Sequence, residues 1–360
     1  EMCIRDSYAV PKYHFNRSAA YAFATRFNLY YLKWEKVVEY ASEVLGSAPS
    51  TVMRDWAAVK QLAWDGSVRT LDYISVGHSF NLLMIPMVTG NGSLFNAWSN
   101  SGARFTHNYR VAKRETYRAK RPMGGPWDRW KDNCIEKVYQ HPPFIWQDND
   151  VNKIYMPKWP NQWEVTDPVT GVGIGRSTMV AFTTNETVLS RAEAYVHLKE
   201  YDKAVADLNA WIGSFYLVGQ NGIESLTRER IAEVYGDPSS NRYIAEYTAL
   251  EPTSRKPLHP HGFTVEAGEQ EHLIQTTLFC RRIETIADGL RWGDIKRYGI
   301  VIDRFDDSAY NDDNTTGFTV AATLGEKDLR RALQLPQEVI TAGLEANPRN
   351  ENRPDHPFCQ

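Results

Sequence analysis

Apolar residues recur at helical spacing in two separate parts of the chain. Residues 34–45, WEKVVEYASEVL, and residues 201–212, YDKAVADLNAWI, carry five apolar positions in the same order and at the same spacing. The aligned pairs are Val37 with Ala204, Val38 with Val205, Ala41 with Leu208, Val44 with Trp211 and Leu45 with Ile212. Because such positions lie on one face of an α-helix, each stretch predicts an amphipathic helix.

A second helical pattern precedes each of these stretches. The first of these leading helices is predicted to bury a face formed by Ala20, Phe23, Ala24, Phe27 and Tyr31. The second is predicted to bury a face formed by Val188, Leu189, Ala192, Tyr195 and Val196. Breaks at Lys33 and at Lys199-Glu200 separate the members of each pair, and Thr183 with Glu186 offers a capping box. The pattern predicts two helical hairpins of the tetratricopeptide type, with two unrelated amphipathic hairpins as the alternative.

Residues 47–178, between the hairpins, have a different composition. They are rich in Gly, Pro, Asn and Trp, and they carry turn signals such as Gly90-Asn91-Gly92. The apolar run LLMIPMV at 82–88 predicts a short buried helix or strand. Residues 152–165 predict a strand or hairpin, which the prolines at 157 and 160 place at a sheet edge. A loop-rich insert therefore separates the hairpins, so they cannot form a simple sequential array.

The remainder of the chain mixes polar loops with helices. One helix is predicted near 226–235, and others at about 268–298 and 327–345, with the acidic loop 303–314 between them. A chain of 360 residues is long for one compact core and suggests about two domains or lobes. We divide it into a non-native scar at 1–7, a first hairpin at 8–46, the insert at 47–178, a second hairpin at 179–218 and a C-terminal region at 219–360.

Composition excludes several classes of function. With 41 basic and 44 acidic residues the net charge is −3, which gives no electrostatic case for binding nucleic acid or an anionic membrane. No apolar run reaches the roughly 18–20 residues of a membrane helix. The first seven residues, EMCIRDS, lack the regions of a signal peptide, so we interpret them as a scar in which Cys3 is no lipid-anchor cysteine. An aromatic content of 12% suits a sugar-binding surface as well as a core.

Motifs of catalysis and cofactor binding are mostly absent. The sequence contains no HExxH, GxSxG, Walker A or EF-hand pattern. GVGIG at 171–175 lacks a strand-then-helix context, so we do not expect it to bind phosphate. His259 and His261 form an HxH that could bind zinc, but a proline-flanked loop without a partner cysteine favours solvent exposure. The four cysteines show no metal-binding spacing, and the sequence does not determine whether any are paired.

Acidic residues suggest two further sites. Asp148 and Asp150 could form a carboxylate pair of the glycosidase type, although a loop pair is usually solvated. The acidic loop could hold calcium through carboxylate oxygens, although a plain charged loop is the favoured interpretation. Its acidic residues are Asp303, Asp306, Asp307, Asp312 and Asp313. We therefore expect no cofactor, with calcium as the exception to test.

Two C-terminal motifs point to a family. The stretch RRIETIADGLRWGDIKRYG at 281–299 carries charged and aromatic residues at helical spacing, and LQLPQEVITAGLEANPRN at 333–350 predicts a proline-started helix that closes on Asn347-Pro348. Together they resemble the C-terminal signature of the SusD/RagB family, which reads R-R-x-E-x-x-x-E-G-x-R-W-x-D-L-R-R followed by P-x-x-E-I and N-P. Asp288-Gly289 stands where Glu-Gly is usual, and Ile295-Lys296 where Leu-Arg is usual.

The resemblance implies a mainly α-helical fold with discontinuous tetratricopeptide-like hairpins and an irregular, loop-rich ligand-binding insert. It implies a lipoprotein on the outer-membrane surface of a Gram-negative bacterium, attached by a lipid anchor. Such proteins capture oligosaccharides without catalysis and deliver them to a SusC-like TonB-dependent transporter. Family members also carry a lipoprotein signal and an N-terminal segment before the first repeat, and we expect both to be missing here.

The signature residues are expected to be structural. Arg281, Glu284, Asp288 and Arg291 are three or four apart and are predicted to pair along one helix face. Trp292 is predicted to pack on the same helix among apolar neighbours. The other members of the signature are Gly289, Asp294, Pro336, Asn347 and Pro348.

Ligand-binding residues are expected in the insert, where aromatics stand among polar side chains. Trp98 is the first candidate for stacking on a sugar, with Asn96, Asn100 and Arg104 beside it to bind hydroxyl groups. The further candidates are Tyr109, Trp127 and Trp130, for each of which a structural role is an equal alternative.

Other functions stay open at this point. The same architecture could capture peptides or other nutrients. A helical-repeat module that binds a protein segment in its concave face would explain the hairpins but not the aromatic insert. A glycoside hydrolase would need two carboxylates about 5–9.5 Å apart, and the sequence offers no embedded pair.

Overall fold

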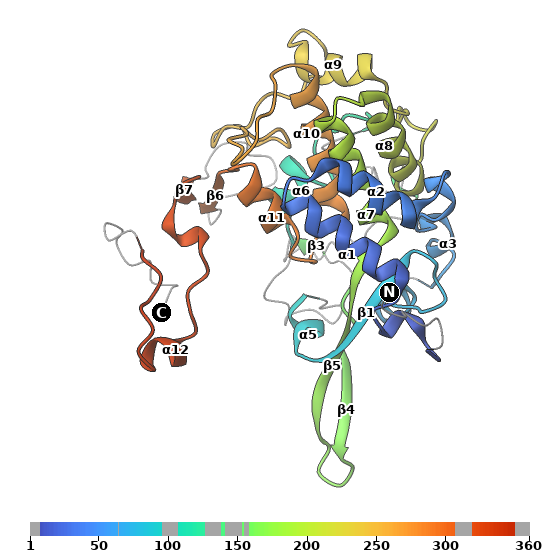
Figure 1. Cartoon of the computed structure of the whole chain (residues 1–360), viewed down its shortest axis with the longest axis vertical. Coiled ribbons are helices and arrows are strands. Elements are labelled where there is room, and N and C mark those ends of the chain that lie inside the picture. The colour runs from blue at the N-terminus through green and yellow to red at the C-terminus, as the bar shows by residue number, and fades with distance from the viewer. Residues whose placement is uncertain are drawn as a thin grey trace.

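The computed structural model describes residues 8–63, 65–95, 107–126, 138–140, 153–154, 158–306 and 319–349. Two helical hairpins lie side by side at its centre (Figure 1). The first consists of α1 (Arg17–Tyr30) and α2 (Trp34–Leu45), and the second of α7 (Thr184–His197) and α8 (Tyr201–Phe215). Because α2 packs against α7, the hairpins are neighbours although the insert separates them in sequence. The mainly helical fold with discontinuous hairpins is confirmed.

The two hairpins turn in the same way. Leu32 and Lys199 each stand two residues before the trailing helix, with φ angles of 59° and 61°. This left-handed conformation is uncommon outside glycine, so its recurrence at aligned positions supports a true repeat. The predicted N-cap is also present, because the Thr183 hydroxyl accepts a hydrogen bond from the Glu186 amide at 3.1 Å.

The trailing helices bury the predicted faces. Val37, Ala41 and Leu45 of α2 are buried, and Val38 and Val44 are half-buried at the edges of the stripe. In α8 the corresponding buried side chains include Ala204, Leu208, Trp211 and Ile212.

The face predicted for α1 is wrong. Its buried side chains are Ala19, Ala22, Thr25 and Leu29. Phe23, Phe27 and Tyr31 are exposed instead, and they form a row in which the ring centroids of Phe27 and Tyr31 lie 4.5 Å apart. Small side chains allow α1 to approach α2, α7 and the sheet closely, whereas three large rings on that side would hold it away. The orientation of α1 therefore follows from the size of its side chains and not from their apolar character.

The central helix α7 is buried on every side, including its polar residues. α10 (Glu269–Glu284) packs across α7, and α9 (Arg228–Gly236) packs against both α8 and α10. The helix predicted near 226–235 is thus confirmed as α9. Buried polar groups need hydrogen-bond partners, so the polar residues of α7 must be satisfied within the core.

The helix predicted over 268–298 is broken in the structure. α10 ends at Glu284 and α11 (Arg291–Arg297) follows a turn in which Ala287 and Gly289 have φ angles of 68° and 78°. A glycine in the left-handed conformation commonly ends a helix. Asp288 lies in this turn, so the predicted pairing of Arg281, Glu284, Asp288 and Arg291 along one helix face is wrong.

The insert contains a three-stranded antiparallel sheet in the order β1–β5–β4. Its strands are β1 (Asn81–Val88), β4 (Gln162–Asp167) and β5 (Val172–Thr183). The run LLMIPMV is therefore a strand, and β4 is an edge strand as predicted. β5 leads directly into α7, so the GVGIG segment does belong to a strand that precedes a helix. The glycines stand at the far end of that strand from the helix, which keeps them away from its N-terminus.

Shorter elements complete the described part of the insert and its surroundings. They are η1 (Pro11–Tyr13), η2 (Pro49–Thr51), α3 (Trp56–Val59), α4 (Gly66–Tyr73), α5 (Asn91–Phe95), β2 (His107–Asn108), α6 (Tyr109–Glu115) and β3 (Lys153–Ile154). Among the described residues, no helix has both the length and the apolar character needed to cross a membrane.

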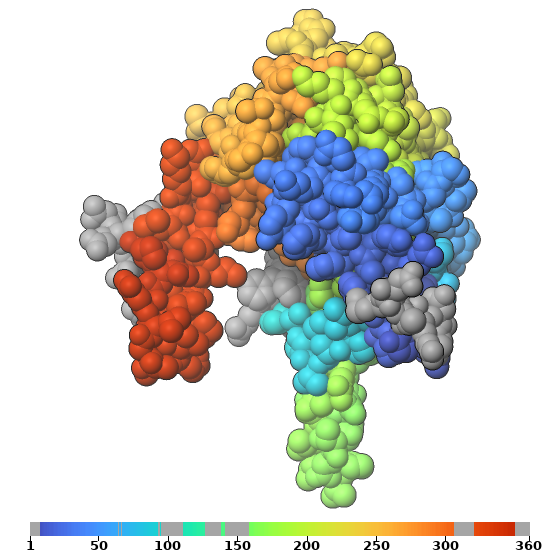
Figure 2. Space-filling model, viewed as in Figure 1, coloured from blue at the N-terminus to red at the C-terminus, as the bar shows by residue number. Residues whose placement is uncertain are grey.

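The C-terminal residues form an arm beside the helical body (Figures 1 and 2). It contains the hairpin of β6 (Ile302–Asp306) and β7 (Thr319–Leu324), then η4 (Leu329–Arg331) and α12 (Gln337–Thr341). The helix predicted over 333–350 is thus much shorter than expected. Arg331 ties the arm to the body through hydrogen bonds to the carbonyl oxygens of Ile295 and Ile300.

Candidate functional site

Most of the predicted ligand-binding residues lie outside the described part of the chain. This applies to Asn96, Trp98, Asn100, Arg104, Trp127 and Trp130. Tyr109 is the first residue of α6, and nothing is described of its side chain. In sequence, Trp98 lies between the end of α5 and the start of β2. The proposed ligand residues therefore remain a prediction, and the structure describes the frame that holds them.

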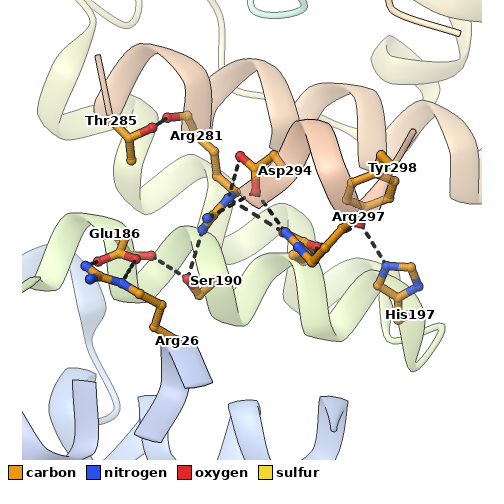
Figure 3. Close-up of polar contacts among 10 residues, drawn as sticks. Arg26, Glu186, Ser190, His197, Arg281, Thr285, Asp294, Arg297 and Tyr298 are labelled. Carbon is orange, nitrogen blue, oxygen red and sulfur yellow. Dashed lines mark hydrogen bonds and ion pairs between the residues drawn. The ribbon is translucent and has the colours of Figure 1, made fainter. Parts of the chain in front are cut away.

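Glu193 of α7 is the centre of a buried ionic network. Figure 3 shows Arg281, Asp294 and Arg297 of this network. Oε1 of Glu193 accepts a hydrogen bond from the Tyr298 hydroxyl at 2.7 Å, and its Oε2 lies 3.2 Å from Nη2 of Arg297. Burial alone would raise the pKa of Glu193, but Arg297 and Arg281 outweigh burial and hold that pKa at about 2. Glu193 is therefore ionised at neutral pH and joins α7 to α11.

Arg281 connects three helices in the same network. Its side chain is fully buried, and its Nη1 donates to the Ser190 hydroxyl at 2.9 Å. Its guanidinium also lies 3.6 Å from Glu193 on α7 and 3.4 Å from Asp294 on α11. The signature arginine thus pairs with carboxylates on other helices.

The network extends to His197 and to α1. Nε2 of His197 lies 3.0 Å from the Tyr298 hydroxyl, and its ring stacks on Trp34 with centroids 4.0 Å apart. Burial lowers the pKa of His197 to about 4, so its imidazole is neutral at pH 7. Nε of Arg26 on α1 donates to Glu186 on α7 at 2.7 Å. Charged contacts therefore hold the first hairpin against the second.

The turn between α10 and α11 anchors the insert. Nζ of Lys158 donates to the Asp288 carboxylate at 2.7 Å, and the indole N–H of Trp159 donates to the carbonyl of Ala287 at 3.0 Å. Glu284 accepts a hydrogen bond from the indole of the buried Trp211 at 2.8 Å. Burial raises the pKa of Asp288, and the positive charge of Lys158 partly offsets this rise. Asp288, which stands where the family has glutamate, thus fixes a segment of the insert to the C-terminal region.

The remaining signature residues have more exposed positions. Trp292 is half-buried against the core. Pro336 precedes α12 as its N-cap residue. Asn347 closes the segment after β7, because its side-chain amide donates to the carbonyl of Leu333 at 2.6 Å. The sequence predicted a closure at Asn347-Pro348 but not this hydrogen bond, since Asn347 and Leu333 face each other across a loop.

The predicted metal sites gain no support from the described residues. Within that part of the chain, no group of three or more His, Cys, Asp or Glu side chains is placed to hold an ion. His259 and His261 are exposed, and their amides bond to the carbonyls of Tyr298 and Arg297. Asp303 accepts hydrogen bonds from the hydroxyls of Tyr247 and Thr323. Asp148, Asp150, Asp307, Asp312 and Asp313 lie outside the described residues, as does the side chain of Asp306.

The structure shows an exposed aromatic that was not among the candidates. Trp163 lies on β4 and is 63% exposed. β4 and β5 form a hairpin that projects from the body (Figure 1). A Cβ at Gly173 of β5 would lie 2.7 Å from the indole nitrogen of Trp163, so the glycine makes room for the ring. The available signal was the alternation of Trp163 and Val165 opposite the GVGIG glycines.

Comparison with known proteins identifies the fold. No protein-family model and no curated protein matches the chain. Among solved structures, a SusD superfamily protein from Bacteroides thetaiotaomicron covers 93% of this chain with a TM-score of 0.51 and 16% identity. A SusD-like carbohydrate binding protein from Bacteroides vulgatus covers 89% of the chain with a TM-score of 0.44 and 15% identity.

The chain spans only part of the length of these structures. It covers 61% of the B. thetaiotaomicron protein and 53% of the B. vulgatus protein. This chain therefore has the fold of SusD-like proteins.

Proposed function

We propose that the protein captures oligosaccharides at the outer-membrane surface of a Gram-negative bacterium and delivers them, without catalysis, to a SusC-like TonB-dependent transporter. The observation that carries this proposal is the SusD-like fold, which extends over 93% of the chain at a TM-score of 0.51. The family signature at 281–299 and the aromatic content support the same conclusion.

The buried network supports a passive scaffold. Its carboxylates Glu193 and Asp294 are bonded to arginines inside the core, so they are not available to a ligand. What the network does is hold α1, α7, α10 and α11 together, while Lys158 fixes the insert to them. Binding residues are commonly carried on loops that a rigid scaffold positions. Trp98 and its polar neighbours are the proposed contacts.

A protein-interaction module of the tetratricopeptide type fits the described residues less well. Such a module binds its partner in the concave face of stacked hairpins. Here α10 of the same chain packs across α7, and α7 is buried on every side. Helix α10 thus covers the face of α7 on which such a module would bind a protein segment.

The test is a tryptophan-fluorescence titration of the protein against plant, host and microbial glycans and against mixed peptides. We expect saturable quenching by one glycan class and no cleavage products. Response to peptides alone would replace glycan capture with peptide capture, and products released from a polysaccharide would replace it with hydrolysis. Transporter delivery needs a separate experiment, in which the purified SusC-like partner should bind the glycan-loaded protein.

A further inference from the structure

The exposed aromatic side chains of this protein are concentrated in one stretch of the chain. Among the residues that the structure describes, eight large aromatic side chains are exposed, and seven of them lie between residues 8 and 31. The eighth is Trp163 on the projecting hairpin. Figure 2 shows the first helical hairpin, in blue, on the outside of the body. Contiguous apolar surface of this kind commonly marks a site of interaction.

Four of these side chains form a continuous row along α1. Phe15 extends the row of Phe23, Phe27 and Tyr31, and the centroids of successive rings lie 5.8, 5.9 and 4.5 Å apart. Each of the four side chains is between 45% and 63% exposed. The row is therefore one connected apolar surface and not a set of scattered rings.

Helix α1 is apolar on both of its sides. One side packs on the body through Ala19, Ala22 and Leu29. The other side carries the row, with Ala20 and Ala24 between its rings, and none of these residues is charged. A surface helix normally has one apolar and one polar face, whereas a helix that is apolar all round is normally buried. We therefore expect a partner to cover the row.

The geometry of the rings favours a helix as that partner over a sugar. Phe27 and Tyr31 are stacked with an angle of 20° between their planes, so their facing surfaces cover each other and cannot receive a sugar ring. Phe23, Phe27 and Tyr31 follow one another at intervals of four residues. Side chains at this interval form the ridges by which helices pack into each other's grooves. Such a ridge can pack beside an identical ridge on a second helix.

The charges at the two ends of α1 are compatible with an antiparallel copy of the same helix. Near its start, Arg17 lies 3.6 Å from Glu43, and both side chains are at least half exposed. Just beyond its end, Lys33 and Glu35 are both exposed. Each end thus carries one charge of each sign. Two copies that pack antiparallel therefore bring no excess of like charge together, which would otherwise oppose association.

The area of the row suits a weak dimer. An aromatic side chain buries about 150–250 Å² when it is fully covered, so four half-exposed rings supply about 400 Å². A standard protein interface takes about 800 Å² from each partner. Residues of α1 and α2 beside the row must supply the remainder. We therefore expect reversible association that depends on protein concentration.

We infer that the row on α1 binds a second copy of this chain, with the two α1 helices antiparallel across a two-fold axis. Such an axis makes the contact self-complementary, because the row on each copy packs against the row on the other. The contact is closed, so association stops at the dimer. This inference does not depend on the proposed capture of glycans, because it rests only on the surface of α1.

Sedimentation velocity over a series of protein concentrations tests the dimer. We expect the wild-type protein to shift from monomer to dimer as its concentration rises, with no larger species. Phe27→Ser should raise the dissociation constant of the dimer about tenfold or more, because aromatic residues near the centre of an interface carry much of the binding energy. Leu250→Ser is the matched control, since it removes an apolar side chain that is 83% exposed and lies outside the row. It should associate like the wild-type protein.

Tyr31→Ser provides the same comparison if Phe27→Ser does not fold. Added sodium chloride should leave the dissociation constant nearly unchanged, because salt screens charges and the row has none. A protein that stays monomeric at every concentration, an open series of larger species, or undiminished association of the row variants would overturn the inference. Dissociation at high salt would assign the contact to charged groups instead. Weaker glycan binding by Phe27→Ser in a monomeric protein would assign the row to the ligand.

Discussion

Arg297 and Glu193 lie 104 residues apart in sequence, yet Nη2 of the arginine is 3.2 Å from Oε2 of the glutamate in the core. The pair joins the second hairpin to the helix that follows the signature turn. Because α7 also packs against α1, α2 and α10, this contact joins α11 to the centre of the helical body.

Replacing Glu193 with Gln should destabilise the protein by about 3–5 kcal/mol, because it leaves the buried Arg281 and Arg297 to share the single carboxylate of Asp294. Urea unfolding measures the change. Glu266→Gln is the matched control, since it breaks an ion pair with Lys199 in which both side chains are more than half exposed. The control should change stability by no more than about 0.5 kcal/mol. Equal effects of the two substitutions would contradict the importance assigned to the network.

Stability should fall as the pH drops from about 6.5 to about 4. His197 has a pKa of about 4 in the folded protein, against an ordinary value of 6.5. In this window the unfolded chain binds a proton that the folded protein does not, so protonation favours unfolding by up to about 3 kcal/mol. His197→Gln should remove this pH dependence, while His261→Gln, at an exposed loop position, should retain it. Unfolding free energies measured across the pH range decide between these outcomes.

Acid should act again at lower pH through Glu193. Its folded pKa of about 2 lies below the ordinary value of 4.5, so its contribution is present above about pH 4.5 and is lost as the pH falls toward 2. The wild-type protein should therefore lose stability in two steps, and Glu193→Gln should weaken the second.

Substitutions on the two sides of α1 should reduce the stability of the protein to different extents. Leu29→Ala should cost about 2–5 kcal/mol because Leu29 is fully buried. Phe27→Ser should cost less than about 1 kcal/mol, since Phe27 is 45% exposed and touches mainly its neighbours in the row. A larger loss from Phe27→Ser than from Leu29→Ala would restore the face predicted from the sequence.

The hairpins could be predicted because α2 and α8 alternate clearly between apolar and polar faces. For α1 the same reasoning failed, since both of its faces are apolar and the smaller side chains entered the core. The signature residues could be recognised, but their partners could not. Arg281 meets Glu193 and Asp294 only after the chain turns at Ala287 and Gly289, and helical spacing contains no information about that turn.

The candidate ligand residues follow from composition and resemblance, so their geometry could not be predicted. Trp163 shows why composition is insufficient. Its exposure depends on a projecting hairpin and on a glycine that makes room for its ring, and neither follows from aromatic content. The ion pairs of Glu115 with Lys256 and Arg282 could not be predicted for a similar reason, because these residues come from α6, a loop and α10, which are remote in sequence.

Replacing Trp211 or Trp292 with Ala should destabilise the protein by different amounts. Trp211→Ala should destabilise by about 3–5 kcal/mol, because Trp211 is fully buried and its removal leaves Glu284 without its indole donor. The packing of Trp292 among apolar neighbours, as predicted from the sequence, would imply a similar loss of stability for Trp292→Ala. Since Trp292 is only half-buried, we now expect about 1–3 kcal/mol. Denaturant unfolding of the two variants side by side tests the order, and a greater loss at Trp292 would contradict it.

Trp98→Ala should weaken glycan binding about fivefold while leaving the fold intact. A stacking aromatic contributes around 1 kcal/mol, by analogy with aromatic ring pairs. Trp163→Ala is the matched control, because it removes an exposed indole on the projecting hairpin, outside the predicted site. Calorimetric titration with the glycan found in the fluorescence screen gives both affinities, and circular dichroism confirms folding. An unchanged affinity would remove Trp98 from the site, loss of folding would make it a core residue, and weakening by Trp163→Ala alone would move the ligand to the hairpin.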